Sequence, residues 1–351
     1  MIQVPDKPSP PRHHFAMDVP LRVTAAALAG LLLVGCAAKA ATQERVEVAL
    51  VADQRGFGDR SYNDAAQRGL DRCAREGAVG VTAVASRSSD DYLSDLSFAA
   101  TQNANEIIAV GGTMARAVHE TAVRFPNAHV ALIDGVADEP NVESVTFDRA
   151  QGGYLAGSLA ALVSRRHQVA FLGGLPSPRL AEIATAFEAG ARAADPRVRV
   201  ASAYAGSFEN TQRAAQAAAQ VFRGGADVAY VVAGPAGLGA IAAARSRRGT
   251  YVIGADADQD GLAPGVVLTS VVEHVAAAVQ RICEDAGAHK PVSGHVVLGL
   301  REGGIGLTDF RYSRAVVSPA VRQRMRDIEE TLAAHEVAVR ADPPRTPSAP
   351  R

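Results

Sequence analysis

From Val46 onward the chain alternates short apolar runs with longer stretches in which apolar residues recur at helical spacing. The runs are nearly continuous rather than alternating, which is typical of parallel strands covered by helices on both faces. The succession of strand, helix and strand predicts a doubly wound α/β unit. Its strands are predicted at 46–52, 79–85, 106–110, 129–134 and 143–147, and its helices at 65–76, 90–103 and 113–125.

The pattern restarts after a helix predicted at 148–164. Two successive α/β units of similar size predict two doubly wound lobes, with the carboxyl ends of the strands of each lobe facing a shared cleft. In the second unit strands are predicted at 168–172, 199–204, 227–232, 250–254 and 266–271, and helices at 179–194, 209–222 and 236–247. A helix at 273–286, a strand at 295–300 and a surface helix at 318–335 follow.

Composition and charge limit the classes of function that the chain can have. A chain of 351 residues exceeds one typical domain, and 48% hydrophobic residues are enough for two cores. The formal net charge is −1 and no run of Lys and Arg forms a phosphate-tracking patch, so we expect no nucleic-acid partner. The three cysteines offer no metal-ligand spacing and are too few for a disulfide scaffold.

The N-terminus indicates export. Residues 21–34 form an apolar segment of the length of a signal-peptide core, too short for a comfortable membrane span. It runs into Leu-Val-Gly-Cys at 33–36, which resembles the lipobox of bacterial lipoproteins, with Cys36 as the acylated residue. The alternative is an uncleaved signal anchor with an incidental cysteine. The first sixteen residues fit a signal peptide poorly, so we expect translation to begin at Met17. The predicted arrangement is a signal peptide at 1–35, a lipidated flexible spacer at 36–45 and anchoring on the extracytoplasmic face of the cell membrane.

Candidate ligand contacts lie at the ends of the predicted strands, because ligands of open α/β sheets bind beyond their carboxyl ends. Asp53 opens a polar loop with two glycines, 53–64, between the first strand and the first helix. Backbone N–H groups and carboxylates can meet a small polar ligand there, although an ordinary βα turn has the same composition. Thr113, Asp134, Gly234 and Asp256 follow later strands.

The motifs of common enzyme classes are missing from the sequence. There is no Walker A lysine and no GxSxG elbow, and residues 234–239 lack the GxGxxG spacing of dinucleotide sites. Asp256 and Asp258 have no further ligand in reach, which favours a hydroxyl acceptor or a turn over a metal site. We therefore predict no catalytic residue, no cofactor and no metal.

Short motifs occur in a fixed order along the chain between the lipobox and residue 310: DRSYN (59–63), NVESVTF (141–147), GYLAG (153–157), FLGG (171–174), FEAG (187–190), YAGSF (204–208), GADADQ (254–259), LTS (268–270) and EGGIG (302–306). Through them the chain resembles the basic membrane protein family. These are lipoprotein substrate-binding components of bacterial ABC importers, several of which bind purine nucleosides. The resemblance implies two lobes joined by a hinge, like type I periplasmic binding proteins. It also implies a monomeric, non-enzymatic receptor that delivers its ligand to a permease with a separate ATPase subunit.

The resemblance implies roles for individual residues. Tyr62 and Phe208 would sandwich a base, unless they are plain core aromatics. Asp53 and Asn63 would hydrogen-bond the base edge or ribose, and Asp256 would accept hydrogen bonds from ribose hydroxyls. The remaining implied contacts are Gln54, Thr113, Gly234 and Glu273.

Two of these positions depart from the family. Glu273 stands where the family generally has a lysine near the ribose, and an acid cannot reproduce the lysine's donors. Gln54 adds bulk where the family often has Gly or Asn. A purine nucleoside remains the leading ligand, with a flavin or a sugar as alternatives.

Cys73 and Cys283 either form a disulfide or remain two buried free thiols. In such folds the helix that carries Cys283 crosses back to the first lobe and lies on the same face as the helix that carries Cys73. In an exported protein that arrangement invites a disulfide.

The predicted first lobe comprises 46–148 and 270–290, and the second lobe 149–269 and 291–315, followed by a surface helix at 316–340 and a disordered tail at 341–351. A membrane-anchored sensor on the same scaffold is an alternative to the transport receptor, and a nucleoside-processing enzyme is a weaker one. A DNA-binding regulator would need an N-terminal helix-turn-helix, which the sequence lacks.

Overall fold

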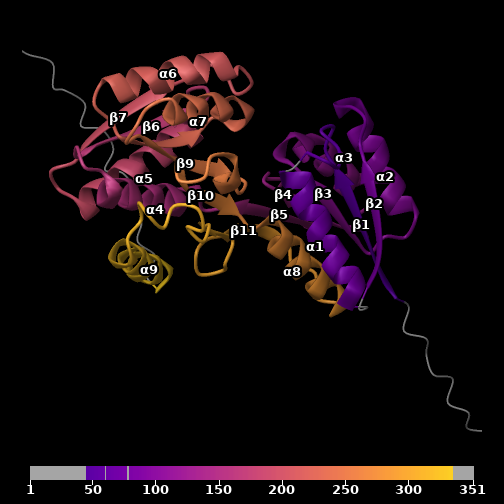
Figure 1. The fold of residues 1–351 in the computed structure, drawn as a ribbon. Helices are drawn as coiled ribbons and strands as arrows, with labels where there is room; N and C mark the ends of the chain where they lie inside the picture. The colour runs from indigo at the N-terminus through magenta and orange to yellow at the C-terminus, as the bar shows by residue number, and fades with distance from the viewer. Residues whose placement is uncertain (1–44, 60, 77–78, 335–351) are drawn as a thin grey trace, which may run out of the picture. The chain divides into compact units, whose positions relative to one another are not determined.

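The computed structural model describes residues 45–59, 61–76 and 79–334 (Figure 1). The predicted signal peptide, Cys36 and the C-terminal tail lie outside the described residues, as does most of the predicted spacer. No helix of the described part is both long enough and apolar enough to cross a bilayer.

The first sheet has six parallel strands in the order β11-β5-β4-β3-β1-β2. Side chains of α1 and α8 pack into the core on one face, and those of α2 and α3 into the core on the other. The strands are β1 (Val46–Ala52), β2 (Val79–Ala85), β3 (Glu106–Val110), β4 (His129–Ile133), β5 (Val142–Phe147) and β11 (Gly294–Leu298). The helices are α1 (Tyr62–Glu76), α2 (Tyr92–Thr101), α3 (Ala115–Arg124) and α8 (Val275–Gly287).

The second sheet repeats this plan in the order β12-β10-β9-β8-β6-β7, with β12 antiparallel to β10. Helices α4, α5 and α9 contribute to the core on one face, and α6 and α7 to the core on the other. The strands are β6 (Gln168–Gly173), β7 (Arg199–Tyr204), β8 (Val228–Val232), β9 (Tyr251–Asp256), β10 (Val267–Glu273) and β12 (Ile305–Leu307). The helices are α4 (Arg149–Val163), α5 (Pro178–Ala194), α6 (Thr211–Arg223), α7 (Gly237–Arg245) and α9 (Pro319–Ala334).

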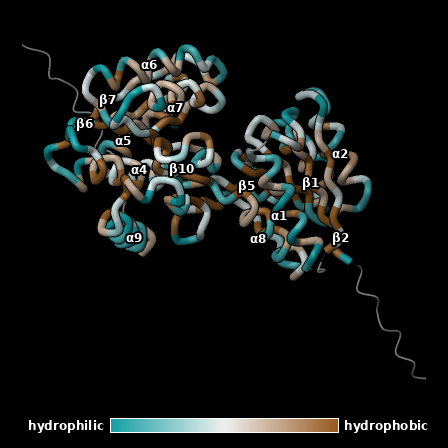
Figure 2. Tube along the Cα trace, in the orientation of Figure 1, coloured by the Kyte–Doolittle hydropathy of each residue, from teal (hydrophilic) through white to brown (hydrophobic). Residues whose placement is uncertain are grey.

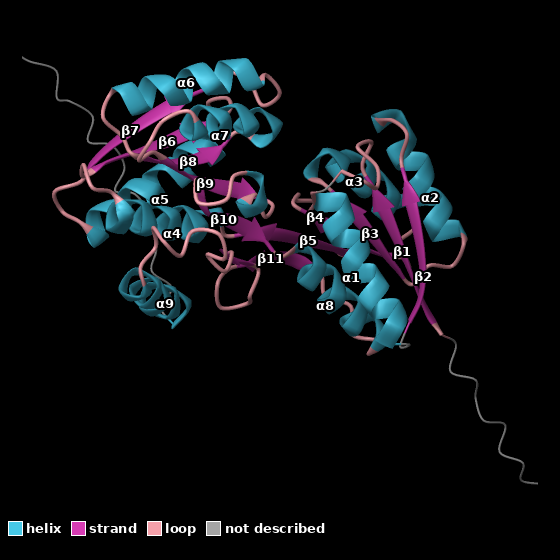
Figure 3. Cartoon of the chain, viewed as in Figure 1, coloured by secondary structure: helices cyan, strands magenta, loops and turns pink. Residues whose placement is uncertain are grey.

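The predicted fold class, two doubly wound parallel-sheet lobes, is confirmed (Figure 3). The central strands are largely hydrophobic, while α9 is largely hydrophilic along its length (Figure 2). One assignment needs correction in part: residues 291–315 were predicted to belong to the second lobe, but β11 pairs with β5 and extends the first sheet, while β12 joins the second sheet as predicted. The chain passes between the sheets after β5, after β10 and again after β11, and an apolar run does not specify which sheet it joins.

Glycines of two motifs allow α4 and α5 to pack closely. A Cβ on Gly157 would lie 1.9 Å from the carbonyl oxygen of Phe187, and one on Gly190 would lie 2.1 Å from that of Tyr154. Because both neighbours are backbone atoms, which cannot move aside, only glycine fits at these two crossings. The GYLAG and FEAG motifs therefore serve helix packing in the second lobe.

Helices α1 and α8 are joined covalently within the first lobe. A disulfide links Cys73 to Cys283, whose Cα atoms are 6.1 Å apart, within the range that disulfides adopt. Gly69, one turn before Cys73, brings the helices together, since a Cβ there would lie 2.5 Å from the carbonyl oxygen of Ala276. The disulfide therefore ties α8, which the chain reaches only after completing β10 of the second sheet, to the first helix of the fold.

Candidate functional site

A cavity of about 480 Å³ lies beyond the carboxyl ends of strands from both sheets. Side chains and backbone that follow β1, β3, β4, β6, β7, β8 and β9 contribute to its lining. This is where open α/β sheets bind their ligands. Most of the predicted contacts line it: Asp53, Gln54, Tyr62 and Thr113 from the first lobe, and Phe208, Gly234 and Asp256 from the second.

Two predicted contacts, Asn63 and Glu273, stand behind the lining rather than in it. Asn63 is fully buried, and its Nδ2 donates to Oδ1 of Asp53 at 2.7 Å and to the carbonyl oxygen of Gly56 at 3.1 Å. Glu273 is 8% exposed, and its Oε1 lies 2.9 Å from Nε of Arg149. Both residues therefore orient a side chain that does reach the cavity.

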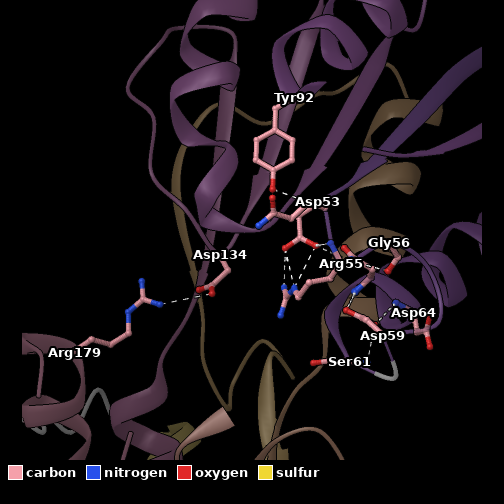
Figure 4. Close-up of polar contacts among 11 residues, drawn as sticks. Asp53, Arg55, Gly56, Asp59, Ser61, Asp64, Tyr92, Asp134 and Arg179 are labelled. Carbon is pink, nitrogen blue, oxygen red and sulfur yellow. Dashed lines mark hydrogen bonds and ion pairs between the residues drawn. The ribbon is translucent and has the colours of Figure 1, made fainter. Parts of the chain in front are cut away.

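The loop after β1 holds Asp53 in place as a fixed acceptor (Figure 4). Its carboxylate accepts hydrogen bonds from Asn63 and from the backbone N–H and guanidinium of Arg55. Burial favours the neutral acid, but the hydrogen bonds from Arg55 and Asn63 outweigh it and lower the pKa of Asp53. The hydroxyl of Tyr92 accepts from the N–H of Gln54 at 3.2 Å and fixes the next residue of the loop. The loop thus presents an ionised carboxylate to the cavity.

Two aspartates hold matching positions in the two lobes. Asp134 follows β4 and Asp256 ends β9, and β4 and β9 occupy the same place in the two strand orders. Both residues adopt left-handed backbone conformations, with φ of 62° for Asp134 and 70° for Asp256, and both line the cavity. Strained backbone of this kind is concentrated at functional sites. Burial raises the pKa of Asp256, while Arg149 acts in the opposite direction.

Arg149 joins the two lobes beneath the cavity. The first residue of α4, it donates from Nη1 to Oδ1 of Asp134 at 2.8 Å and from Nη2 to the hydroxyl of Tyr62 at 2.6 Å. Its Nε pairs with Glu273 at 2.9 Å. Burial opposes its charge, but Tyr62, Glu273 and Asp134 outweigh burial and raise the pKa of Arg149. The guanidinium is therefore a permanent cation, and it also lines the cavity.

Arg149 is a site residue that was not predicted from the sequence. The signal available was its place at the start of the helix after β5, beside Asp148, whose side chain caps α4 by accepting from the N–H of Gln151. That position is the point at which the chain leaves the first sheet for the second. A basic residue there faces the ends of strands from both lobes.

Glu273 is an unusual acid because it is buried beside other carboxylates. Burial raises its pKa to about 8, and Asp256 and Asp134 act in the same direction, although Arg149 lowers it. Its Oε2 has no hydrogen-bond partner among the described residues. The group therefore tends to carry a proton near neutral pH, which limits the negative charge that Arg149 must balance.

Phe208 lies across the carboxyl edge of the second sheet, where Gly174 leaves room for its ring and Gly234 lies at contact distance. A Cβ on Gly174, after β6, would lie 2.4 Å from Cδ1 of Phe208, and one on Gly234, after β8, would lie 3.6 Å from the same atom. The side chain is 38% exposed, unusually high for a phenylalanine. An exposed ring on the cavity wall offers an apolar face to a flat ligand.

Arg179, near the start of α5, completes the polar lining. Its Nη1 lies 3.6 Å from Oδ2 of Asp134, and its side chain is 58% exposed (Figure 4). With Arg55 and Arg149 it balances Asp53, Asp134 and Asp256 around the cavity. A balanced set of donors and acceptors, together with aromatic faces, suits a neutral polar ligand with a flat ring better than a strongly charged one. In the described part of the chain no group of three His, Cys, Asp or Glu side chains could hold a metal ion.

The family described as ABC transporter substrate-binding protein, PnrA-like, matches residues 46–340. The chain is 29% identical over 316 residues to the ABC transporter nucleoside-binding protein BmpA of Lactococcus lactis, covering 82% of this chain and 90% of that protein. It is 30% identical over 279 residues to Basic membrane protein A of Borreliella afzelii, covering 77% and 85% of the two chains.

Solved structures share the fold at lower identity. A transcriptional activator of the comK gene from Bacillus halodurans superposes with a TM-score of 0.73 at 22% identity, over 83% of this chain and 98% of that one. An ABC transporter solute-binding protein from Conexibacter woesei superposes with a TM-score of 0.70 at 24% identity, over 85% and 98% of the two chains. At such identities these two likenesses concern the architecture.

Proposed function

The chain belongs to the family of PnrA-like substrate-binding proteins of ABC transporters, and on that premise we propose that its cavity captures a nucleoside, with a purine base favoured. Members of this family are binding proteins rather than enzymes. The relative named as a nucleoside-binding protein matches over most of both chains, which supports the same ligand class here.

The observation that carries the proposal is the meeting of two aromatic rings and fixed carboxylates in one cavity. Tyr62 comes from the first lobe and Phe208 from the second, and both line it with Asp53 and Asp256. A purine is a flat ring with polar edges, and stacking is worth roughly 1 kcal/mol per aromatic pair beyond the area buried. We assign the base to the space between Tyr62 and Phe208, with Gly234 allowing the backbone to approach it.

The ribose is assigned to the carboxylates. Asp256 accepts from the ribose hydroxyls, and hydrogen bonds to an ionised acceptor are about twice as strong as neutral ones. Asp53, held by Asn63, accepts from the base edge or the ribose. Thr113 and Gln54 supply further polar contacts from the first lobe.

Arg149 supplies hydrogen-bond donors in place of the lysine that the family generally has at position 273. Three of its N–H groups are engaged by Asp134, Tyr62 and Glu273. A guanidinium has further donors on Nη1 and Nη2. We assign these to the oxygens of the ligand, while Glu273 accepts from Nε and fixes the guanidinium plane.

The cellular role follows from the family. We propose that the chain is exported, acylated at Cys36 and held by that lipid on the extracytoplasmic face of the cell membrane. Its lobes would close on the nucleoside about the segments that connect the two sheets. The monomeric receptor would then deliver the nucleoside to a permease driven by a separate ATPase subunit.

A thermal-shift panel tests the ligand class. Purine nucleosides should raise the unfolding temperature, while pyrimidine nucleosides, free bases, a flavin and sugars should raise it less. Phe208→Ala should abolish most of the shift, whereas Phe98→Ala, an exposed ring at 59% on α2 that does not line the cavity, should leave it unchanged. If a flavin or a sugar raises the unfolding temperature and no nucleoside does, the proposed ligand class is wrong, while the proposed role as a receptor is retained. Equal losses in the two variants would refute stacking on Phe208.

A further inference from the structure

The amino edge of the second sheet gathers arginines that are far apart in sequence. In a doubly wound fold the loops before the strands all reach the same edge, away from the ligand end. Residues 165–166 precede β6, residues 197–199 lead into β7, residue 223 precedes β8 and residues 245–248 precede β9. The exposed side chains there are Arg165, Arg166, Arg197, Arg199, Arg223, Arg245, Arg247 and Arg248, which we call the arginine edge.

Hydrogen bonds along this edge confirm that the segments lie together. The carboxylate of Asp227, before β8, accepts from the backbone N–H groups of Arg165 and Arg166. The N–H of Tyr251, at the start of β9, donates to the carbonyl oxygen of Asp227 at 2.8 Å, and the N–H of Arg199 donates to that of His167 at 2.8 Å. The loops before β6, β7, β8 and β9 are therefore adjacent, and these four strands are neighbours in the sheet (Figure 3).

Local acids do not balance this charge. Asp227 is 4% exposed, and Asp195 is engaged by His167 and Arg197. Helices α4, α5, α6 and α7 end at this edge, and each helix terminus contributes only about half a negative charge. Eight arginines against two aspartates and four helix ends leave a clear positive excess, in a chain whose formal net charge is −1. The charge is thus segregated rather than spread evenly.

The edge also has a recess beside one of its arginines. A cavity of about 280 Å³ is lined by Gln168, Arg199, Val221 and Gly224, among others, between β6, β7 and the end of α6. Arg199 stands in its wall, and Arg223 is the residue before Gly224. Guanidinium groups bind phosphate oxygens in pairs of parallel hydrogen bonds, which lysine cannot do. The recess accommodates a phosphate-bearing group among the arginines.

We propose that the arginine edge is an interaction surface for anionic phospholipid headgroups. A substrate-binding protein of an ABC transporter works beside a membrane, so phosphate-bearing headgroups are the polyanionic surface nearest to it. Four adjacent strands, about 4.8 Å apart, give a surface wide enough to meet several headgroups at once. The edge does not contribute to the ligand cavity, so adsorption leaves the nucleoside site free.

The aromatic content of the edge favours lipid over single-stranded nucleic acid. Proteins that bind such strands stack successive bases on exposed aromatic rings. Here Phe222 is 1% exposed and Tyr251 is only partly exposed, so neither offers an open face. Lipid headgroups need charge and hydrogen-bond donors without stacking.

Vesicle co-sedimentation of the full chain tests the proposal. All proteins in the assay carry Cys36→Ser, which prevents acylation. The measured quantity is the increase in vesicle binding when phosphatidylglycerol is added to phosphatidylcholine vesicles. Because the apolar segment 21–34 contributes equally to both kinds of vesicle, this difference cancels its contribution. Arg197→Gln, Arg199→Gln and Arg223→Gln together should reduce that increase by about tenfold or more, since each arginine near an anionic surface strengthens binding by about fivefold. Rising salt should weaken wild-type binding.

The matched control removes three exposed arginines from α1 of the first lobe, Arg68, Arg72 and Arg75. That variant should bind the anionic vesicles as the wild type does. Both variants should keep the thermal shift with nucleoside, because none of the six residues lines the ligand cavity. Equal losses of vesicle binding in the two triple variants would refute the role of the arginine edge. The proposal would also be refuted if wild-type binding did not increase with phosphatidylglycerol, or if the wild type bound an RNA oligomer more tightly than the vesicles.

Discussion

Replacing Arg149 by glutamine removes the guanidinium that holds Asp134, Tyr62 and Glu273 together beneath the cavity. The side chain of Arg149 is 16% exposed and that of Glu273 is 3% exposed, so solvent screens their pairing weakly. Removing one partner of a buried ion pair costs about 3–5 kcal/mol, because the other charge is left uncompensated. We expect Arg149→Gln to lower the free energy of unfolding by about 3 kcal/mol, the lower end of this range, because Glu273 tends to carry a proton near neutral pH and leaves less charge uncompensated.

The protonation of Glu273 also determines how the loss of unfolding free energy in Arg149→Gln depends on pH. The pKa of Glu273 is about 8 in the folded protein, against 4.5 as the reference for an unperturbed glutamate. The folded state therefore binds more protons than the unfolded state between these values, and the free energy of unfolding falls as pH rises through this window. Without Arg149 the pKa of Glu273 rises further, so the loss should be larger at about pH 9 than at about pH 6. Glu273→Gln should flatten the pH dependence of the wild type.

Urea unfolding followed by far-ultraviolet circular dichroism measures these changes, and the chain has no tryptophan to report by fluorescence. Arg179→Gln is the matched control, because Arg179 also approaches Asp134 but is 58% exposed. It should cost less than about 1 kcal/mol. Two results would refute the role of Arg149 as a buried cation that holds three side chains together. One is that Arg149→Gln is no more destabilising than Arg179→Gln. The other is that its loss of unfolding free energy does not grow with pH.

Three further outcomes are expected. Tyr62→Ala should weaken purine nucleoside binding by about tenfold in calorimetry, through lost stacking and apolar contact, and unchanged affinity would discredit stacking on this ring. Gly157→Ala should lower the free energy of unfolding by more than about 2 kcal/mol, because its Cβ would meet the backbone of Phe187, and a stable variant would contradict the close helix packing. The denatured, unreduced protein should show no free thiol from Cys73 or Cys283, and two titratable thiols beyond any from Cys36 would exclude the disulfide.

The sequence predicted the elements well because the central strands of both sheets are buried on both faces. These strands read as continuous apolar runs, and the helices between them as amphipathic stretches, so positions agree closely along most of the chain. The family resemblance is likewise confirmed. The assignment of β11 failed because pairing partners depend on where the chain crosses between the lobes, which the local pattern does not encode.

At the site, the sequence identified residues whose position after a strand brings them to the cavity, such as Asp53 and Asp256. It did not predict that Asn63, in the first turn of α1, and Glu273, at the end of β10, would lie behind the lining, because the burial of a side chain at the end of an element depends on neighbours from other elements. Arg149 was missed because its three partners come from α1, the end of β4 and the end of β10. A residue that contacts three separate elements in this way can be recognised only from the folded structure of both lobes.

Calorimetric titration of the wild type and Asp256→Asn with a purine nucleoside and with its free base tests whether the cavity is a nucleoside site. We expect the wild type to bind the nucleoside at one site and the free base more weakly. Asp256→Asn should lose about tenfold or more of its nucleoside affinity, while its affinity for the free base stays unchanged, because the lost acceptor serves the ribose. No binding of any nucleoside by the wild type, or full nucleoside affinity in Asp256→Asn, would contradict this expectation.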